Sequence, residues 1–260
     1  MLKFRSAISA AALMLILFIP CSHAVTRDEV VAGAESMYLA RITEAQSQYQ
    51  LDNDRIFLAR VQRILDGLIK QAKLDHPNAS EFAWELHITD APDESASCMA
   101  GGKLLLGQPY VIRLELTDAE LAMLLSHEMQ HALLDHNFKE FQEALKLEPG
   151  RRNASFLELE EAIDHDDALM SKLSEFDKAQ ESEADLEGLR MAWRAGWSAL
   201  GLAGYFKKLE HADPMPNSDH FDHPASALRR QAARQLATEL SQRKVQPESV
   251  AVPDVFTQHE

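Results

Sequence analysis

The feature that most constrains this chain is a pair of histidines four residues apart, His127 and His131, in the run S-H-E-M-Q-H. Upstream, Thr117 and Glu120 form the pattern of a capping box, in which each side chain accepts from an amide at the start of a helix. Leucines then recur at helical spacing up to the histidines. We therefore predict a helix from Thr117 to about His136, with both imidazoles on one face and one turn apart.

Two neutral imidazoles on one helix face can hold a zinc ion. Glu128, which lies beside them in the sequence, can accept a proton from a water molecule that the zinc makes more acidic. This spacing predicts one zinc ion per chain, with Glu128 as the general base of a hydrolase. The alternative is an ordinary pair of surface histidines on an amphipathic helix.

A third zinc ligand has to come from elsewhere, because no histidine-rich run follows His131. A second helix, predicted at about 179–195, carries Glu181 and Asp185 on one face, whereas Glu183 points roughly the other way. We assign Glu181 to the metal. We assign Asp185 to a hydrogen bond with the far nitrogen of a ligand histidine. The alternative is an acidic, solvated helix face.

The rest of the chain predicts an α+β fold that is rich in helices and has a small sheet. Alternating apolar and polar residues at 82–89 indicate a strand, and 103–106 and 110–116 are two further strand candidates. The small, polar residues at 91–98 indicate a loop. Further helices are expected in 25–75, in pieces around loops within 137–178, and at about 198–211 and 224–243.

The first 24 residues have the pattern of a secretory signal peptide. Lys3 and Arg5 precede an apolar run at 7–20, and small residues lead up to a cleavage site predicted after Ala24. The apolar run is short for a membrane span, so we expect a periplasmic protein with no stable span after cleavage. A lipoprotein attached through Cys21 is the weaker alternative, because the residues before that cysteine are a poor lipobox.

Charge narrows the choice of partners. The formal net charge is -15, which disfavours binding to nucleic acid or to an anionic membrane surface. Once the leader is removed, Cys98 is the only remaining cysteine, and it cannot form an internal disulfide. Stability must therefore come from packing and from metal.

Taken together, these motifs resemble peptidase family M48, which includes the CAAX prenyl endopeptidase and bacterial periplasmic and membrane-bound proteases. The resemblance covers roughly 82–235. It rests on H-E-x-x-H at 127–131 and E-x-x-A-D at 181–185, supported by Ala119-Glu120-Leu121, by Gly101-Gly102, and by His223-Pro224 with Arg229. It implies a zincin-like domain with peptidase activity.

The resemblance also implies roles outside the zinc ligands. It makes His223 a candidate fourth, regulatory ligand, and His223 or Arg229 a candidate transition-state stabiliser; the alternative for His223 is an ordinary loop histidine. In this class a substrate peptide adds to an edge strand. Our candidate for that strand is the segment Gly102, Lys103, Leu104, Leu105 and Leu106, and the alternative is an ordinary buried strand.

Two departures limit the resemblance. The segment that reads N-A-F-x-x-P-G-G in the family is here Ser95 to Gly102, with the sequence S-A-S-C-M-A-G-G. No tetratricopeptide-like region is recognisable after the last predicted helix, so partner docking known from larger relatives is not carried over.

These observations lead us to predict one metallopeptidase domain at 25–260, after a signal peptide at 1–24. The domain comprises N-terminal helices at 25–75, a catalytic core at 82–235 and a tail at 246–260. The expected substrates are misfolded or misassembled envelope proteins. One alternative is a periplasmic chaperone or adaptor with a latent or structural zinc site. Another is a zinc hydrolase that acts on non-peptide bonds.

Overall fold

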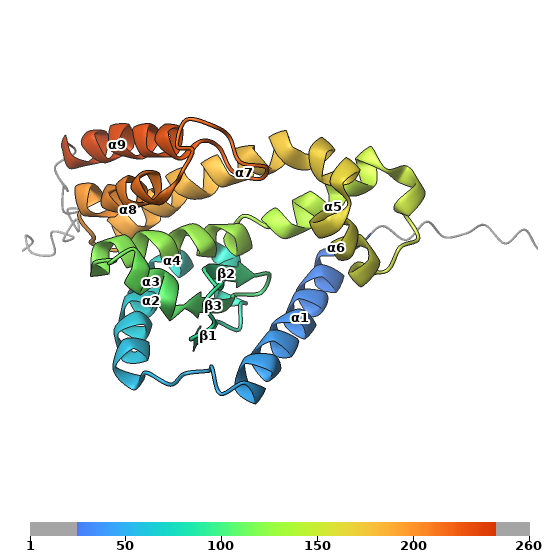
Figure 1. The fold of residues 1–260 in the computed structure, drawn as a ribbon, viewed down its shortest axis with the longest axis horizontal. Helices are drawn as coiled ribbons and strands as arrows, with labels where there is room; N and C mark the ends of the chain where they lie inside the picture. The colour runs from blue at the N-terminus through green and yellow to red at the C-terminus, as the bar shows by residue number, and fades with distance from the viewer. Residues whose placement is uncertain (1–24, 243–260) are drawn as a thin grey trace, which may run out of the picture.

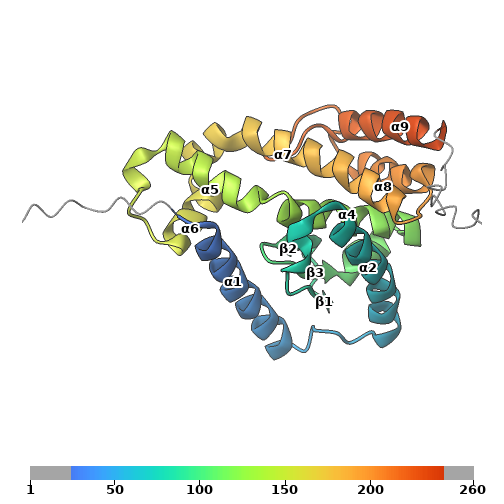
Figure 2. The ribbon, with the colours of Figure 1, turned by 180° about the vertical axis from the view of Figure 1, so that it is seen from behind.

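Helix α4 (Asp118–Leu133) lies at the centre of the fold in the computed structural model, which describes residues 25–242. On one side it packs against the sheet and α2 (Arg55–Asp75), and on the other against α7 (Asp167–Arg194) and α8 (Ala199–Ala212) (Figure 1; seen from behind in Figure 2). The predicted signal peptide and the 246–260 tail lie outside the described residues.

Helices dominate the described chain, and the sheet is small, which confirms the helix-rich α+β prediction. The other helices are α1 (Arg27–Ser47), α3 (Gln108–Arg113), α5 (His136–Leu147), α6 (Phe156–His165) and α9 (Ser226–Gln242), with 3-10 turns at Pro77–Ser80 and Pro149–Arg151. A large hydrophobic core surrounds α4, and a smaller one lies where α1 meets α5, α6 and the start of α7.

The start of α4 follows the sequence prediction. Thr117 is the N-cap, its hydroxyl accepts from the Glu120 amide, and the Glu120 carboxylate accepts from the Thr117 amide at 2.8 Å. The helix ends earlier than expected, at Leu133, because Asp135 adopts a left-handed conformation with φ of 55°. His136 therefore begins a separate helix, α5.

The sheet has the strand order β1-β3-β2, formed by β1 (Glu85–Thr89), β2 (Ala96–Met99) and β3 (Lys103–Gly107). β3 runs parallel to β1 and antiparallel to β2. The β2–β3 connection contains Gly101 and Gly102 at φ of +85° and +87°, a region that favours glycine. A Cβ atom at Gly102 would also lie only 2.8 Å from the Trp84 ring.

This strand order corrects the predicted substrate strand. Gly102 lies just before β3, and Lys103 to Leu106 lie within it; β3 is the central strand and pairs on both sides. A strand with two paired edges has no backbone groups left to receive a peptide, so that prediction is wrong. The two edge strands are β1 and β2, and β2 lies within the segment that we expected to be a loop. Only Cys98 of its four residues is buried, so its sequence lacks the alternation that signals a strand.

A second correction concerns residues 110–116, which we expected to be a strand. Residues Gln108–Arg113 form α3, with Pro109 in its first turn, where proline is tolerated. Val111 and Leu114 face the core, and that spacing of three is helical. A short apolar run cannot be assigned from periodicity alone, which explains the error.

Helix α7 is longer than its predicted span of 179–195. The Asp166 side chain caps it by accepting from the amides of Ala168 and Leu169. No glycine or proline interrupts the sequence from there to Gly188, so the helix continues unbroken. Its C-terminal half thereby reaches α4, beside the two histidines.

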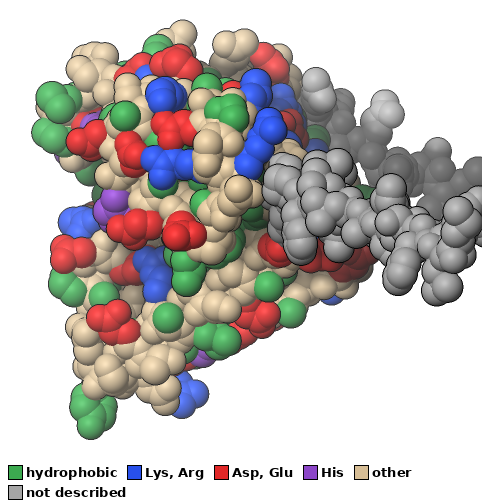
Figure 3. Space-filling model, turned by 90° about the vertical axis from the view of Figure 1, so that its right-hand side faces the viewer, with side chains coloured by type: hydrophobic (Ala, Val, Ile, Leu, Met, Phe, Trp, Pro, Cys, Tyr) green, Lys and Arg blue, Asp and Glu red, His purple; other side chains and the backbone are tan. Residues whose placement is uncertain are grey.

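The surface of the described part is mixed in character. Acidic, basic and apolar side chains are interspersed on the face in Figure 3. None of the helices between residues 25 and 242 combines the length and the apolar character that a membrane crossing requires.

Candidate active site

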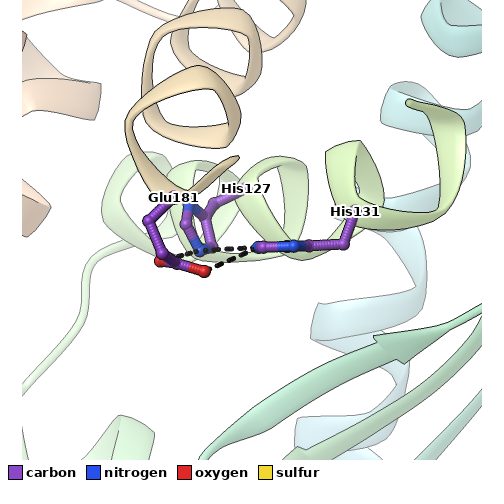
Figure 4. A group of neighbouring side chains, drawn as sticks. All are labelled: His127, His131 and Glu181. Carbon is purple, nitrogen blue, oxygen red and sulfur yellow. Dashed lines mark hydrogen bonds and ion pairs between the residues drawn. The ribbon is translucent and has the colours of Figure 1, made fainter. Parts of the chain in front are cut away.

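Three side chains from two helices converge on one point. His127 and His131 project from α4 and Glu181 from α7 (Figure 4). The two Nε2 atoms lie 3.3 Å apart, and Glu181 approaches them with Oε2 3.4 Å from His127 and Oε1 3.2 Å from His131. His127 and Glu181 are buried, whereas His131 is partly exposed, so the group can be reached from one side.

A glycine on α7 allows this approach. Gly188 packs against the α4 backbone, and a Cβ atom there would lie 3.0 Å from the His127 amide nitrogen. Any larger residue would push the two helices apart at this point. Asp185 lies one turn and Glu181 two turns before Gly188 on the same helix, so close packing at Gly188 brings both carboxylates to His127.

The three donor groups fit a zinc ion. Two ligand atoms on a tetrahedral zinc ion, each about 2.0–2.1 Å from the metal, lie roughly 3.3 Å apart. The spacings between the two imidazole nitrogens and the Glu181 oxygens are 3.2–3.4 Å. Two histidines and one carboxylate are also a donor set of catalytic zinc sites, which keep a further position open.

The far nitrogen of His127 has a carboxylate partner. Its Nδ1 lies 2.9 Å from Asp185 Oδ1, and both side chains are almost fully buried. Asp185 is held in turn by Arg229 of α9, whose Nε and Nη2 donate to its two oxygens at 2.8 and 2.7 Å. This places Asp185 next to the far nitrogen of a candidate ligand histidine.

Charge in the metal-free group is strongly coupled. Burial disfavours a charged His127, but Glu181 and Asp185 outweigh that effect and raise its pKa to about 10. Burial also opposes ionisation of Glu181, yet the neighbouring histidines hold its pKa well below the ordinary value. Metal binding at such a site displaces the proton from His127, because a ligand imidazole must be neutral.

Glu128 lies at the same site but outside the donor group. Its Oε1 is 4.0 Å from His127 Nε2, and its side chain is 17% exposed. Burial raises the pKa of this carboxyl group, and the nearby histidines offset only part of the rise. A carboxylate with a raised pKa is suited to taking up and releasing a proton near neutral pH.

The site opens into a cavity of about 800 Å³. The side chains of β2 form one wall, and α4 contributes His127, Glu128 and His131. The loop between α8 and α9 covers the cavity from another side and carries His223. A chain segment that enters this cavity therefore passes between an edge strand and the candidate zinc ligands.

His223 and Arg229 both lie next to Glu181 but in different settings. His223 Nε2 is 3.1 Å from Glu181 Oε2, and its Nδ1 is 2.7 Å from Asp222. The His223 side chain is 38% exposed, at the cavity mouth. Arg229 Nη2 is 3.4 Å from Glu181, but its guanidinium is engaged by both oxygens of Asp185.

Two residues next to the site, His136 and Glu183, were given no role at the metal from the sequence: His136 was expected to be structural rather than a ligand, and Glu183 to point roughly away. His136 is buried, with its Nδ1 3.2 Å from Nδ1 of His131 and its Nε2 3.3 Å from Glu183. Burial and the neighbouring His131 lower the pKa of His136 to about 3, so the ring is neutral. Its spacing of five from His131 does not match one face of a helix, and the helix breaks between the two residues, at Asp135.

A smaller cavity of about 310 Å³ adjoins the site and is lined by acidic groups from three helices and a loop. Glu140 lies on α5, Asp177 on α7 and Asp164 on α6, and Asp222 lies on the loop before α9. Burial, followed by repulsion from the neighbouring carboxylates, raises the pKa of Glu140 to about 8 and that of Asp177 to about 6. Near neutral pH these groups oppose folding when they ionise.

We expect Glu140→Gln to stabilise the metal-free protein at pH 8 but not at pH 5. The pKa of Glu140 is higher in the folded than in the unfolded state, so the folded state binds more protons and its stability falls as pH rises from about 4.5 to 8. Glutamine removes that loss, roughly 1–2 kcal/mol at pH 8. Urea unfolding at both pH values measures this difference in stability. The control is Glu161→Gln, at an exposed side chain of α6. An equal gain at pH 5 and pH 8 would contradict ionisation as the cause.

Comparison with known proteins agrees with this geometry. The family described as Peptidase family M48 matches residues 58–237. Metalloendopeptidase OMA1 of Bos taurus, a mitochondrial protein, is 27% identical over 196 residues, which cover 70% of this chain and 36% of the relative. OMA1 of Homo sapiens gives the same identity and coverage.

A bacterial relative matches more closely over a shorter stretch. Metalloprotease LoiP of Escherichia coli (strain K12) is 32% identical over 152 residues, which cover 55% of this chain and 59% of LoiP. The matches thus span about a third of the mitochondrial relatives and somewhat more than half of LoiP. The family match extends from α2 to α9 and includes all three candidate ligands, and the chain belongs to peptidase family M48.

Proposed function

We propose that this chain is a zinc-dependent endopeptidase. The observation that carries the proposal is the meeting of His127, His131 and Glu181 at tetrahedral spacing, with Glu128 beside them in one open cavity. A structural zinc site is closed by four protein ligands and needs no base next to it. Membership of a peptidase family and relatives that are named metallopeptidases support the same activity.

Zinc held by His127, His131 and Glu181 would supply a Lewis acid, which polarises a carbonyl group and makes a water molecule more acidic. Glu128 accepts the proton of the attacking water and then passes it to the nitrogen of the leaving amine. Its partly buried position keeps the proton on the carboxyl group between the two transfers. Asp185 fixes the orientation of the His127 ring through Nδ1.

We propose that the substrate pairs with β2. Among the described strands, β2 pairs only with β3, so its second edge is free, and Ala96 to Met99 line the cavity. The Gly107 amide donates to the Ser95 carbonyl at 2.6 Å, so Ser95 directs its backbone groups toward β3. Successive residues of a strand direct their N–H and C=O groups to opposite sides. The backbone groups of Ala96 and Cys98 therefore face the free edge and can bind a peptide.

An extended peptide is the substrate form that such an edge can accept. A folded protein seldom offers a free strand, whereas an unfolded or misassembled chain does. The predicted leader at 1–24 would export this chain, so we propose misfolded or misassembled envelope proteins in the periplasm as its substrates.

The test is cleavage of unfolded casein by chain 25–260 before and after removal of metal. We expect about one zinc per chain, loss of cleavage on treatment with a chelator, and recovery when one equivalent of zinc is returned. If the chain binds no zinc, the proposal fails. If it binds zinc but does not cut, a latent or structural site is favoured.

The contact of His223 with Glu181 is a structural basis for zinc binding without cleavage, because it puts a further imidazole beside the candidate ligands. A chaperone or adaptor with a latent zinc site is therefore the second candidate function. His223→Ala distinguishes the cases: cleavage that appears only in this variant indicates a latent peptidase, and none in either protein favours the adaptor.

A further inference from the structure

The second ligand histidine, His131, also has a partner on its far nitrogen, but this partner is another imidazole. Its Nε2 faces Glu181, and its Nδ1 lies 3.2 Å from Nδ1 of His136. The other nitrogen of His136 lies 3.3 Å from Glu183 Oε2. His136 is only 1% exposed, so water cannot replace either contact.

Only one placement of protons satisfies all these contacts when His131 acts as a ligand. A ligand nitrogen carries no proton, so the His131 proton must be on Nδ1 and point at His136. His136 Nδ1 must then be an acceptor, and its proton must lie on Nε2, where it is donated to Glu183. A proton on both Nδ1 atoms would set two donors against each other.

The backbone fixes His136 in this place. Asp135, at φ of 55°, turns the chain between α4 and α5, and Arg27 holds its carboxylate at 2.7 Å. The carbonyl of His136 accepts from Gln180 Nε2 of α7 at 3.2 Å. The His131 and His136 rings meet edge to face, at an angle of 81°.

The acidic residues at 181–185 of α7 thus contact both histidines, directly or through His136. Glu181 faces the metal position, Asp185 contacts His127 directly, and Glu183 reaches His131 through His136. Glu183, which the helix period directs away from the metal, therefore has a contact of its own next to the site. Its side chain is 49% exposed, so most of the constraint on His131 comes from the buried His136 ring.

We infer that His136, oriented by Glu183, is a positioning residue that sets the tautomer and ring orientation of His131 for metal binding. The inference rests on the proposed function, because it takes His131 as a zinc ligand. In other zinc sites, removal of a residue that orients a ligand histidine weakens metal binding roughly 10–100-fold. Loss of the His136 acceptor should therefore weaken zinc binding to a similar extent.

The experiment measures zinc dissociation constants by competition with a chromophoric chelator, without using peptidase activity. His136→Phe keeps an aromatic ring but has no acceptor, and we expect its Kd to rise about 10–100-fold. His136→Asn places an amide oxygen close to the Nδ1 position, so we expect a Kd within about threefold of the wild type. Thermal melting of the metal-free proteins shows whether each variant is folded.

A third variant keeps the test decisive if His136→Phe does not fold. Glu183→Ala changes a half-exposed side chain, and we expect its Kd to rise severalfold, whereas Glu175→Ala on the same helix, 89% exposed, leaves it unchanged. A Kd that is unchanged in His136→Phe, or raised equally in His136→Asn, overturns the inference while the proposed function stands. A wild-type chain that binds no zinc overturns the proposed function itself.

Discussion

Glu128→Gln is expected to lower the rate of casein cleavage by roughly 10³-fold or more and to leave zinc binding intact. Glutamine has nearly the same shape as glutamate but cannot take up a proton from water at neutral pH. Glu128 lies outside the group of three donors, with its carboxylate 4.0 Å from His127 Nε2, so the ligands keep their places. Cleavage rate and zinc content, measured on the same samples, give the result.

The matched control is Glu175→Gln, which changes an exposed residue of α7. We expect this variant to cleave casein at the wild-type rate. If Glu128→Gln retains zinc and still cuts at a comparable rate, the proton acceptor is another group. If it loses zinc together with activity, Glu128 helps to hold the metal and the assignment of roles must change.

The two histidines and Glu128 could be placed from sequence because their geometry is local. A capping box fixes where α4 begins, and four residues of helix then fix where His131 lies relative to His127. The same rule put Glu181 and Asp185 on one face of α7. What sequence could not supply is the meeting of the two helices, which depends on the absence of a side chain at Gly188 against the α4 backbone.

The sequence predictions that failed concern features that depend on contacts between different segments of the chain. β2 is a strand because it pairs with β3, not because its residues alternate, and the place of β3 at the centre depends on β1, which pairs with its other side. The contact of His136 with His131 was not predicted because Asp135 breaks the helix between them. Helical spacing does not carry across such a turn, so only the three-dimensional structure shows that the two rings touch.

The buried pair of Arg229 and Asp185 leads to the second large effect. We expect Arg229→Met to destabilise the metal-free protein by roughly 3–5 kcal/mol. The guanidinium donates to both oxygens of Asp185 at 2.8 and 2.7 Å, and the side chains are only 9% and 5% exposed. Burial opposes ionisation of Asp185, and Arg229, then His127, lower its pKa again. Methionine fills similar space but leaves a buried carboxylate with one partner fewer.

Urea unfolding compares this variant with Arg230→Met on the same helix, where the arginine is 37% exposed and pairs with Glu210. A half-exposed ion pair contributes about 1 kcal/mol at most, so the control should differ little from the wild type. In the double variant Arg229→Met with Asp185→Asn, we expect part of the loss to be recovered, since no unpaired charge remains. Equal effects of Arg229→Met and Arg230→Met would mean that His127 alone holds Asp185, and that α9 contributes nothing to the orientation of the zinc ligand.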